Sequence, residues 1–139
     1  MIQIIAGRKG KGKTKILLEK ANQAVASASG TIVYLDKSTK HMYELNSRVR
    51  MINISDYPIS SYDAFLGFIS GIISQDYDLQ EVYFDSFLKI ADLEGKPIDK
   101  AIDDLAQLSD KHGITFVLSI SVDACELPEN AKSNIVIAL

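Results

Sequence analysis

Gly7-Arg8-Lys9-Gly10-Lys11-Gly12-Lys13-Thr14 is the stretch of this sequence that decides the fold. It matches G-x-x-x-x-G-K-S/T at every fixed position, which is the pattern of a phosphate-binding loop. Residues 1–6 are mostly apolar and predict a short buried strand before the loop, and residues 15–21 predict the first turns of a helix after it. A strand, a glycine-rich turn and a helix start create an anion site, because the first amides of a helix have no partner within it.

The loop predicts a nucleotide as the ligand. Its glycines leave room for the backbone to wrap closely around phosphates. Lys13 is placed to reach the β- and γ-phosphates, and the Thr14 hydroxyl is placed to ligate Mg²⁺. We therefore expect ATP and Mg²⁺ as cofactors, bound by Gly7, Arg8, Lys9, Gly10, Lys11, Gly12, Lys13 and Thr14. A chance match in a basic turn is the alternative, and the flanking strand and helix argue against it.

The length and the net charge of the chain limit the class of protein to which it can belong. A chain of 139 residues with 47% hydrophobic and 24% charged residues is long enough for one globular domain. Its net charge of −3 disfavours nucleic acid as the main partner. Basic residues are nevertheless concentrated in the loop and the first helical turn, namely Arg8, Lys9, Lys11, Lys13 and Lys15. A phosphate-facing loop is sufficient to explain them, and a polyanion contact beside it is the alternative.

Three features favour a cytoplasmic protein that does not cross a membrane. The most apolar stretch, residues 65–73, is far shorter than the roughly 20 residues that span a bilayer. We expect its Gly67-x-x-x-Gly71 pattern to permit close packing of a helix on a sheet. The single cysteine, Cys125, cannot form an intrachain disulfide, which fits a reducing compartment, and we expect it to be buried. The chain starts directly with a strand and the loop, so no targeting segment is expected.

Apolar strand segments alternate with helical segments along the whole chain. The expected strands are 1–6, 31–36, 49–54, 79–85, 115–120 and 134–139. The expected helices are 14–26, 60–75 and 97–111, with short helical segments after residues 37 and 85. Such alternation predicts a single three-layer α/β/α domain over residues 1–139, with a mostly parallel sheet and helices on both faces.

Two expected strands end in an aspartate. Ligands of open α/β sheets lie at the carboxyl ends of the strands, so both side chains point to the same edge as the loop. Asp85 is the candidate metal ligand opposite Thr14, and an aspartate that caps the following turn is the alternative. Asp36 ends the strand that follows the first long helix.

The segment Asp85-Ser86-Phe87-Leu88, the long helix after it and the strand from Gly113 to Ser121 together resemble the RecA/DnaB-like P-loop ATPases. The resemblance implies a P-loop NTPase fold with a five-stranded sheet in the order 5-1-4-3-2. The strand at 115–120 would then lie between the strands at 1–6 and 79–85. It also implies that Asp85 binds the metal and that Ser119 or Ser121 senses the γ-phosphate; a solvated strand end is the alternative for the serines.

In that family a glutamate orients the attacking water, usually at the end of the strand after the first helix. This sequence has Asp36 there, whose carboxylate reaches about one methylene less far, and Asp36 is therefore the candidate catalytic base. Ser86 stands where other ATPase branches have a glutamate beside the metal-binding aspartate. Arg48 and Arg50 are open to two interpretations, an arginine finger for a neighbouring subunit or a solvated strand edge.

Other P-loop families fit less of the chain. Residues 4–8 are similar to the start of some bacterial recombination nuclease/helicase subunits, but the likeness stops after the first helix. A nucleoside kinase needs an arginine-rich lid that is not evident. A GTPase needs Asn-Lys-x-Asp, which Asn130-Ala131-Lys132-Ser133 does not fit.

These inferences predict a small ATP–Mg²⁺-binding protein whose slow ATP hydrolysis is coupled to a conformational change or to a partner. One alternative is a nucleotide-binding switch or degenerate scaffold without hydrolysis. Another is a DNA-associated motor fragment, against which the acidic charge argues. A protein partner or homo-oligomer is expected, and the sequence does not identify it.

Overall fold

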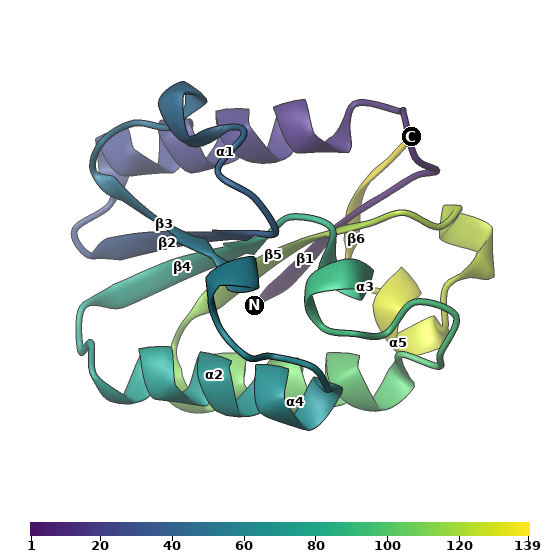
Figure 1. Cartoon of the computed structure of the whole chain (residues 1–139). Coiled ribbons are helices and arrows are strands. Elements are labelled where there is room, and N and C mark those ends of the chain that lie inside the picture. Colours follow the sequence, from purple (N-terminus) through teal and green to yellow (C-terminus); the bar gives the residue numbers. More distant parts are fainter.

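A parallel six-stranded sheet forms the centre of the molecule in the computed structural model, which describes all 139 residues (Figure 1). The strands lie in the order β3-β2-β4-β5-β1-β6, and every neighbouring pair is parallel. Their bounds are β1 (Ile2–Ala6), β2 (Thr31–Asp36), β3 (Val49–Asn53), β4 (Leu79–Phe84), β5 (Thr115–Ile120) and β6 (Ile135–Ala138). The four central strands are mostly apolar and mostly buried, as expected for strands covered on both faces.

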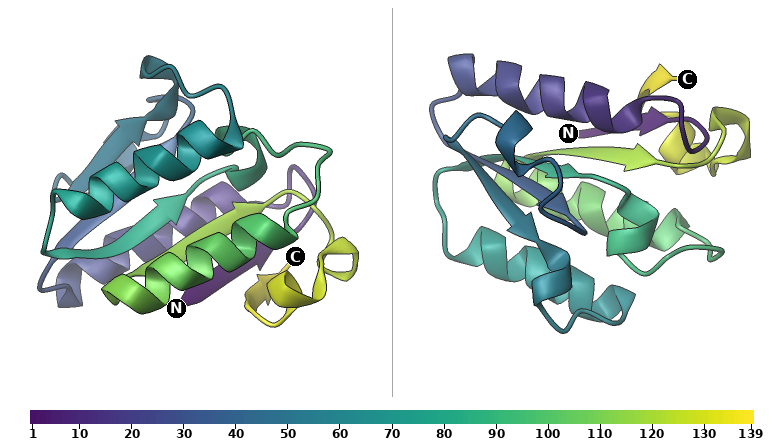
Figure 2. Two further views of the ribbon diagram at one scale, coloured as in Figure 1. Left: turned by 90° about the horizontal axis from the view of Figure 1, so that it is seen from below. Right: turned by 45° about the horizontal axis from the view of Figure 1, so that its top comes forward.

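Helices cover both faces of the sheet, so the expected α/β class is confirmed. Figures 1 and 2 show that α1 crosses one face and that α2 and α4 lie side by side on the other. The helices are α1 (Lys13–Ser27), α2 (Tyr62–Ser74), α3 (Phe87–Ile90), α4 (Asp99–His112) and α5 (Glu129–Lys132), with 3₁₀ turns at Met42–Glu44, Ile54–Asp56 and Ala124–Glu126. The short helix α5 lies between the expected strands 115–120 and 134–139, where no helix was expected.

The five-stranded sheet that the resemblance implied is wrong, because the strand expected at 49–54 forms β3 and joins the sheet as a sixth strand. β3 pairs with β2 in register from Ile32 opposite Val49 to Asp36 opposite Asn53, and it covers an edge of β2 that a five-stranded sheet would leave open. An unpaired edge exposes backbone donors and acceptors, so the added strand satisfies them. The sheet does place β5 between β1 and β4, as expected for the strand at 115–120.

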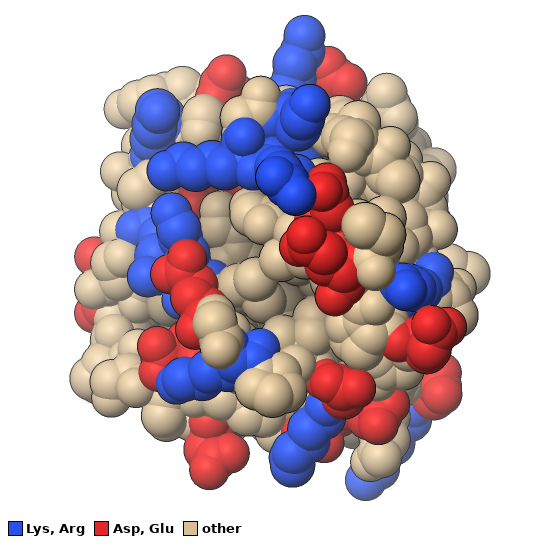
Figure 3. Space-filling view, turned by 90° about the vertical axis from the view of Figure 1, so that its right-hand side faces the viewer, with Lys and Arg blue, Asp and Glu red and all other residues tan.

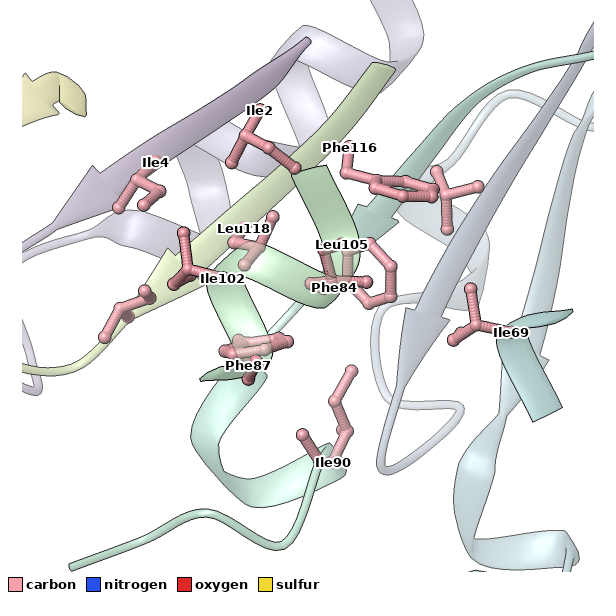
Figure 4. Packing of buried hydrophobic residues seen from close by; sticks show 14 of the residues in the cluster. Ile2, Ile4, Ile69, Phe84, Phe87, Ile90, Ile102, Leu105, Phe116 and Leu118 are labelled. Atoms are coloured by element: carbon pink, nitrogen blue, oxygen red, sulfur yellow. The ribbon is translucent and has the colours of Figure 1, made fainter. Parts of the chain in front are cut away.

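Each face of the sheet has its own hydrophobic core. The smaller cluster, of 11 buried residues, packs α1 onto the sheet, and the larger cluster, of 25, lies under α2, α3 and α4. Phe84 lies in the middle of the larger core (Figure 4). Its ring centre is 5.8 Å from that of Phe65, 5.9 Å from that of Phe87 and 5.5 Å from that of Phe116. This packing fixes the end of β4, and with it the position of the residue that follows, Asp85.

Three local features bear on the expectations for partners and location. Gly67 and Gly71 do not pack on the sheet, because both are exposed and a Cβ added at either would meet nothing within 4 Å. Cys125 is exposed, contrary to the expectation that it is buried. No helix in the molecule has the length and apolar character required to cross a bilayer.

Candidate functional site

The glycine-rich loop, residues 7–12, joins the carboxyl end of β1 to the first turn of α1. Gly10 and Gly12 adopt left-handed conformations with φ of 87° and 90°, which cost a residue with a side chain about 1–2 kcal/mol. Gly12 is the N-cap of α1, no side chain caps the first amides, and the first turn carries no acidic residue. The start of α1 therefore presents backbone N–H groups and the positive end of the helix dipole toward a ligand.

Gly7 is required for a different reason. Its N–H donates to the carbonyl of Ile120 at 3.2 Å, and a Cβ at this position would lie 2.9 Å from Cβ of Leu139. The Leu139 N–H donates to the Ala6 carbonyl at 2.8 Å. The first residue of the loop is thus enclosed between β5 and the end of β6, which fixes where the loop leaves the sheet.

Lys13 folds back over the loop. Its Nζ donates to the carbonyl oxygen of Arg8 at 2.9 Å, and the residue is only 7% exposed. Burial lowers the pKa of Lys13 below its ordinary value, while the negative charge of Asp85 opposes that shift. The ammonium group is thereby held within the loop, next to the open amides of α1.

Asp85 lies at the centre of a buried network directly after β4. Its Oδ1 accepts hydrogen bonds from Oγ1 of Thr14 at 3.1 Å and from Oγ of Ser119 at 3.3 Å. Its Oδ2 accepts from the hydroxyl of Tyr34 at 2.8 Å. Burial and then the charge of Asp85 raise the pKa of Tyr34, so the phenol stays protonated as a donor. The network brings together four elements that are far apart in the chain.

Ser119 is part of this network and is 1% exposed, so a solvated strand end is the wrong interpretation for it. Its Oγ also accepts a hydrogen bond from the N–H of Ser86 at 2.8 Å. Ser86 has φ of 55°, in the left-handed region that residues with a side chain rarely adopt. This turn directs the chain from β4 into α3 while it leaves the Asp85 carboxylate at the sheet edge.

Asp36 is the last residue of β2, and β2 lies next to β4, the strand directly before Asp85. Its Oδ1 accepts the N–H of Lys37 at 2.7 Å, and the residue is 7% exposed. Burial, and then the negative charge of Asp85, raise the pKa of Asp36 above its usual range. A raised pKa makes a carboxylate a better proton acceptor.

A cavity of about 800 Å³ opens above these residues, within the roughly 300–1,000 Å³ typical of small-ligand sites. Figure 3 shows this end of the molecule, where Lys and Arg side chains gather along one edge of a hollow. The lining consists mostly of polar residues: Lys9, Gly10, Gly12, Lys13, Thr14, Asp85, Ser86, Leu88, Lys89, Glu94, Gly95, Ser119, Ser121 and Val122. The structure therefore gathers most of the loop, the candidate metal ligands and the candidate sensors on one cavity.

Four of the predicted site residues do not line the cavity: Gly7, Arg8, Lys11 and Asp36. The guanidinium of Arg8 instead pairs with Asp123 at 2.8 Å and with Glu126 at 3.5 Å. Arg8 therefore ties the glycine-rich loop to the connection that follows β5.

Two residues of the site, Tyr34 and Glu94, were not predicted from the sequence. Tyr34 appeared as one apolar residue of a buried strand, and no pattern marks which buried tyrosine has a polar partner. Glu94 lies in the connection between α3 and α4 and is the only glutamate that lines the cavity. The left-handed residues Asp92 and Gly95 on either side of it shape this connection, with φ of 57° and 72°.

The donor atoms at the sheet edge fit a magnesium ion. Mg²⁺ takes oxygen ligands and is usually bound by one or two carboxylates together with substrate phosphates. The Thr14 hydroxyl and the Asp85 carboxylate supply such oxygens beside the amides that would receive phosphates.

Comparison with known proteins adds no name to this site. No protein-family model matches the chain, and no curated protein matches it. The geometry of the site is therefore the basis on which its function is inferred.

Proposed function

We propose that this protein binds ATP–Mg²⁺ in the cavity and hydrolyses it slowly, in a P-loop NTPase domain of RecA-like strand order. The main support is one arrangement: the open first turn of α1, the buried Lys13 and the Thr14–Asp85 pair all lie on the same cavity. Coupling of the nucleotide state to a conformational change or a partner, in the cytoplasm, is part of this proposal.

The loop and α1 would hold the phosphates. Backbone amides after Gly12 would donate to the phosphate oxygens, and Lys13 would exchange its hydrogen bond to the Arg8 carbonyl for one to the β- or γ-phosphate. Lys9 also lines the cavity and is exposed, so its charge would add to the attraction.

Thr14 and Asp85 would hold the metal, which neutralises negative charge on the phosphates when it is bound. Ser119 donates to the same carboxylate oxygen as Thr14, and it lines the cavity from β5, between β1 and β4, which supports a role as the sensor of the γ-phosphate. It would report the presence of that phosphate to Ser86 and α3 through the hydrogen bond it accepts.

Direct binding is the first test. Calorimetric titration of the wild-type protein with ATP should show one site with a dissociation constant of roughly a millimolar or tighter. Replacing Mg²⁺ by EDTA should weaken binding by about tenfold or more, because Thr14 and Asp85 then have no metal to hold. No heat of binding at millimolar ATP in the presence of Mg²⁺ would contradict the proposal.

Hydrolysis requires a group that orients water and accepts its proton. The water oxygen forms a bond to the γ-phosphorus, the bond to the β–γ bridging oxygen breaks, and the water proton goes to a carboxylate. Asp36 and Glu94 are the two candidates. We favour Glu94, because it lines the cavity while Asp36 does not, and because its longer side chain suits a water in front of the γ-phosphate.

We expect Glu94→Gln to lower the rate of phosphate release by roughly 10²–10⁴-fold, the contribution typical of a general base, with little change in ATP affinity. Asp92→Asn is the matched control, since Asp92 is an exposed carboxylate in the same connection that does not line the cavity. Asp36→Asn is measured in parallel. A wild-type rate in Glu94→Gln together with a large loss in Asp36→Asn would assign the role to Asp36.

A second candidate function is a nucleotide-binding switch without turnover. The geometry of Asp36 favours it: Asp36 does not line the cavity, and its Oδ1 already accepts the backbone N–H of Lys37, so it is poorly placed to take a proton from water. Phosphate release from the wild-type protein decides between the two: no turnover, with or without candidate partners, together with tight ATP binding would favour the switch.

A further inference from the structure

We propose that Tyr34 is a positioning residue for the metal site: its hydroxyl holds one carboxylate oxygen of Asp85 so that the other faces Thr14. This inference rests on the proposed binding of nucleotide and Mg²⁺. It adds a role for a strand residue that lies outside the loop and does not line the cavity.

The two oxygens of Asp85 have different partners. Oδ2 accepts only from Tyr34, at 2.8 Å, whereas Oδ1 accepts from Thr14 at 3.1 Å and from Ser119 at 3.3 Å. A carboxylate can rotate about its last bond, since this torsion is broad and roughly two-fold. The Tyr34 hydroxyl restricts this rotation from the side of the carboxylate opposite Thr14.

β2 holds both the backbone and the side chain of Asp85. The Asp85 N–H donates to the Leu35 carbonyl at 2.9 Å, and Tyr34, the residue before Leu35, donates to the carboxylate. Because β2 and β4 are central neighbours in the sheet, these two bonds tie Asp85 to a rigid element. Rigid support of this kind is what a metal ligand needs to keep its orientation.

The phenol ring of Tyr34 is itself fixed. Tyr34 is fully buried, it lies opposite Tyr83 in the β2–β4 register, and the two rings stack with centres 6.2 Å apart and planes 13° apart. A buried hydroxyl needs a partner, and the two tyrosines use theirs differently. Tyr83 donates to Glu81 at 2.6 Å, away from the site, whereas Tyr34 donates to Asp85.

The pair of stacked tyrosines provides a matched comparison. Tyr34→Phe and Tyr83→Phe each remove one hydroxyl from neighbouring rings of the same core and leave the rings in place. Only the first variant removes a donor from Asp85. A purely structural role would make the two variants behave alike toward the metal.

The experiment measures ATP affinity by calorimetry in Mg²⁺ and again in EDTA, and the ratio of the two affinities is the magnesium enhancement. We expect Tyr34→Phe to reduce this enhancement by about tenfold or more, the effect typical of removing a partner that orients a metal ligand. Affinity in EDTA should stay within about twofold of wild type, because the loop and Lys13 are unchanged. Tyr83→Phe should keep both values.

A double-mutant cycle with Asp85→Asn tests whether Tyr34 acts through Asp85. Asp85→Asn alone should remove the enhancement, and Tyr34→Phe added to it should change nothing further. The double variant also removes the buried charge, so a Tyr34→Phe change that unfolds the protein only while Asp85 is present would itself show that the hydroxyl acts on Asp85, and one that unfolds it equally in both backgrounds would contradict this.

The outcomes separate this inference from the proposed function. Full enhancement in Tyr34→Phe, equal losses of enhancement in both tyrosine variants, or a further loss of ATP affinity in the Asp85→Asn background would each overturn the role of Tyr34 while nucleotide binding stands. Wild-type protein that binds ATP without any magnesium enhancement would do the same. Wild-type protein that binds no nucleotide would overturn both.

Discussion

Replacing Lys13 by alanine should remove measurable ATP binding while the protein stays folded. The Lys13 ammonium is held inside the loop by the Arg8 carbonyl and lies where the phosphates would meet the amides of α1. Truncating one partner of a buried charge pair typically costs about 2–5 kcal/mol, which is roughly 30-fold to several thousand-fold in affinity. From a starting dissociation constant of about 0.1 mM, a loss of this size raises it to roughly 3 mM or weaker, which calorimetry does not detect.

Lys15→Ala is the control for charge alone. Lys15 lies two residues further along α1, is exposed and does not line the cavity, so this variant removes the same charge from the same helix. We expect its ATP affinity to change by only a few-fold, through weaker long-range attraction. Both variants should show the far-ultraviolet circular dichroism of the wild type. Unchanged affinity in Lys13→Ala, or equal losses in both variants, would show that the loop does not bind phosphate through this lysine.

The second large effect concerns stability. Phe84→Ala should lower the free energy of unfolding by about 3–5 kcal/mol, the usual cost of truncating a fully buried phenylalanine. Phe84 is completely buried and packs against Phe65, Phe87 and Phe116, from α2, α3 and β5. Domains of this size are stable by only about 5–15 kcal/mol, so the variant should be marginal. Urea denaturation followed by circular dichroism measures the difference.

Phe68→Ala is the comparison for this prediction. Phe68 lies on the same helix as Phe65 but is only half-buried, and its ring packs on the exposed Tyr57 at a centre distance of 5.4 Å. Folding removes less apolar area of Phe68 from water, so the loss of unfolding free energy should be clearly smaller than for Phe84→Ala. Equal losses in both variants would mean that the aromatic cluster around Phe84 is not the centre of the core.

The order of elements was predictable, because periodicity and end signals are local. Ser61 is an example: it lies at the expected start of the second long helix, residues 60–75, and its hydroxyl accepts the Ala64 N–H at 3.1 Å. The sheet edge was harder, since whether residues 49–54 pair with β2 depends on an interaction between two strands and not on either alone. That is why the sheet has six strands although the family resemblance implied five.

The candidate site, too, could be predicted from the sequence only in part. The glycine-rich loop, Lys13, Thr14 and Asp85 could be named from the sequence, because a motif and a strand end are read along the chain. Their meeting on one cavity, with Thr14 and Asp85 in hydrogen-bond contact, is a property of the sheet order. Parallel strands bring their carboxyl ends to one edge, so residues 71 positions apart become neighbours.

The sequence by itself determined the α/β class, the anion-binding pattern at Gly7–Thr14 and the aspartates that end β2 and β4. Only the tertiary structure decided that Tyr34 holds Asp85, that Ser119 is buried beside it, that Arg8 pairs away from the cavity and that Glu94 lines it. The physical reason is that local propensity follows from neighbouring residues, whereas hydrogen bonds between buried side chains depend on which strands and connections the packed core brings together.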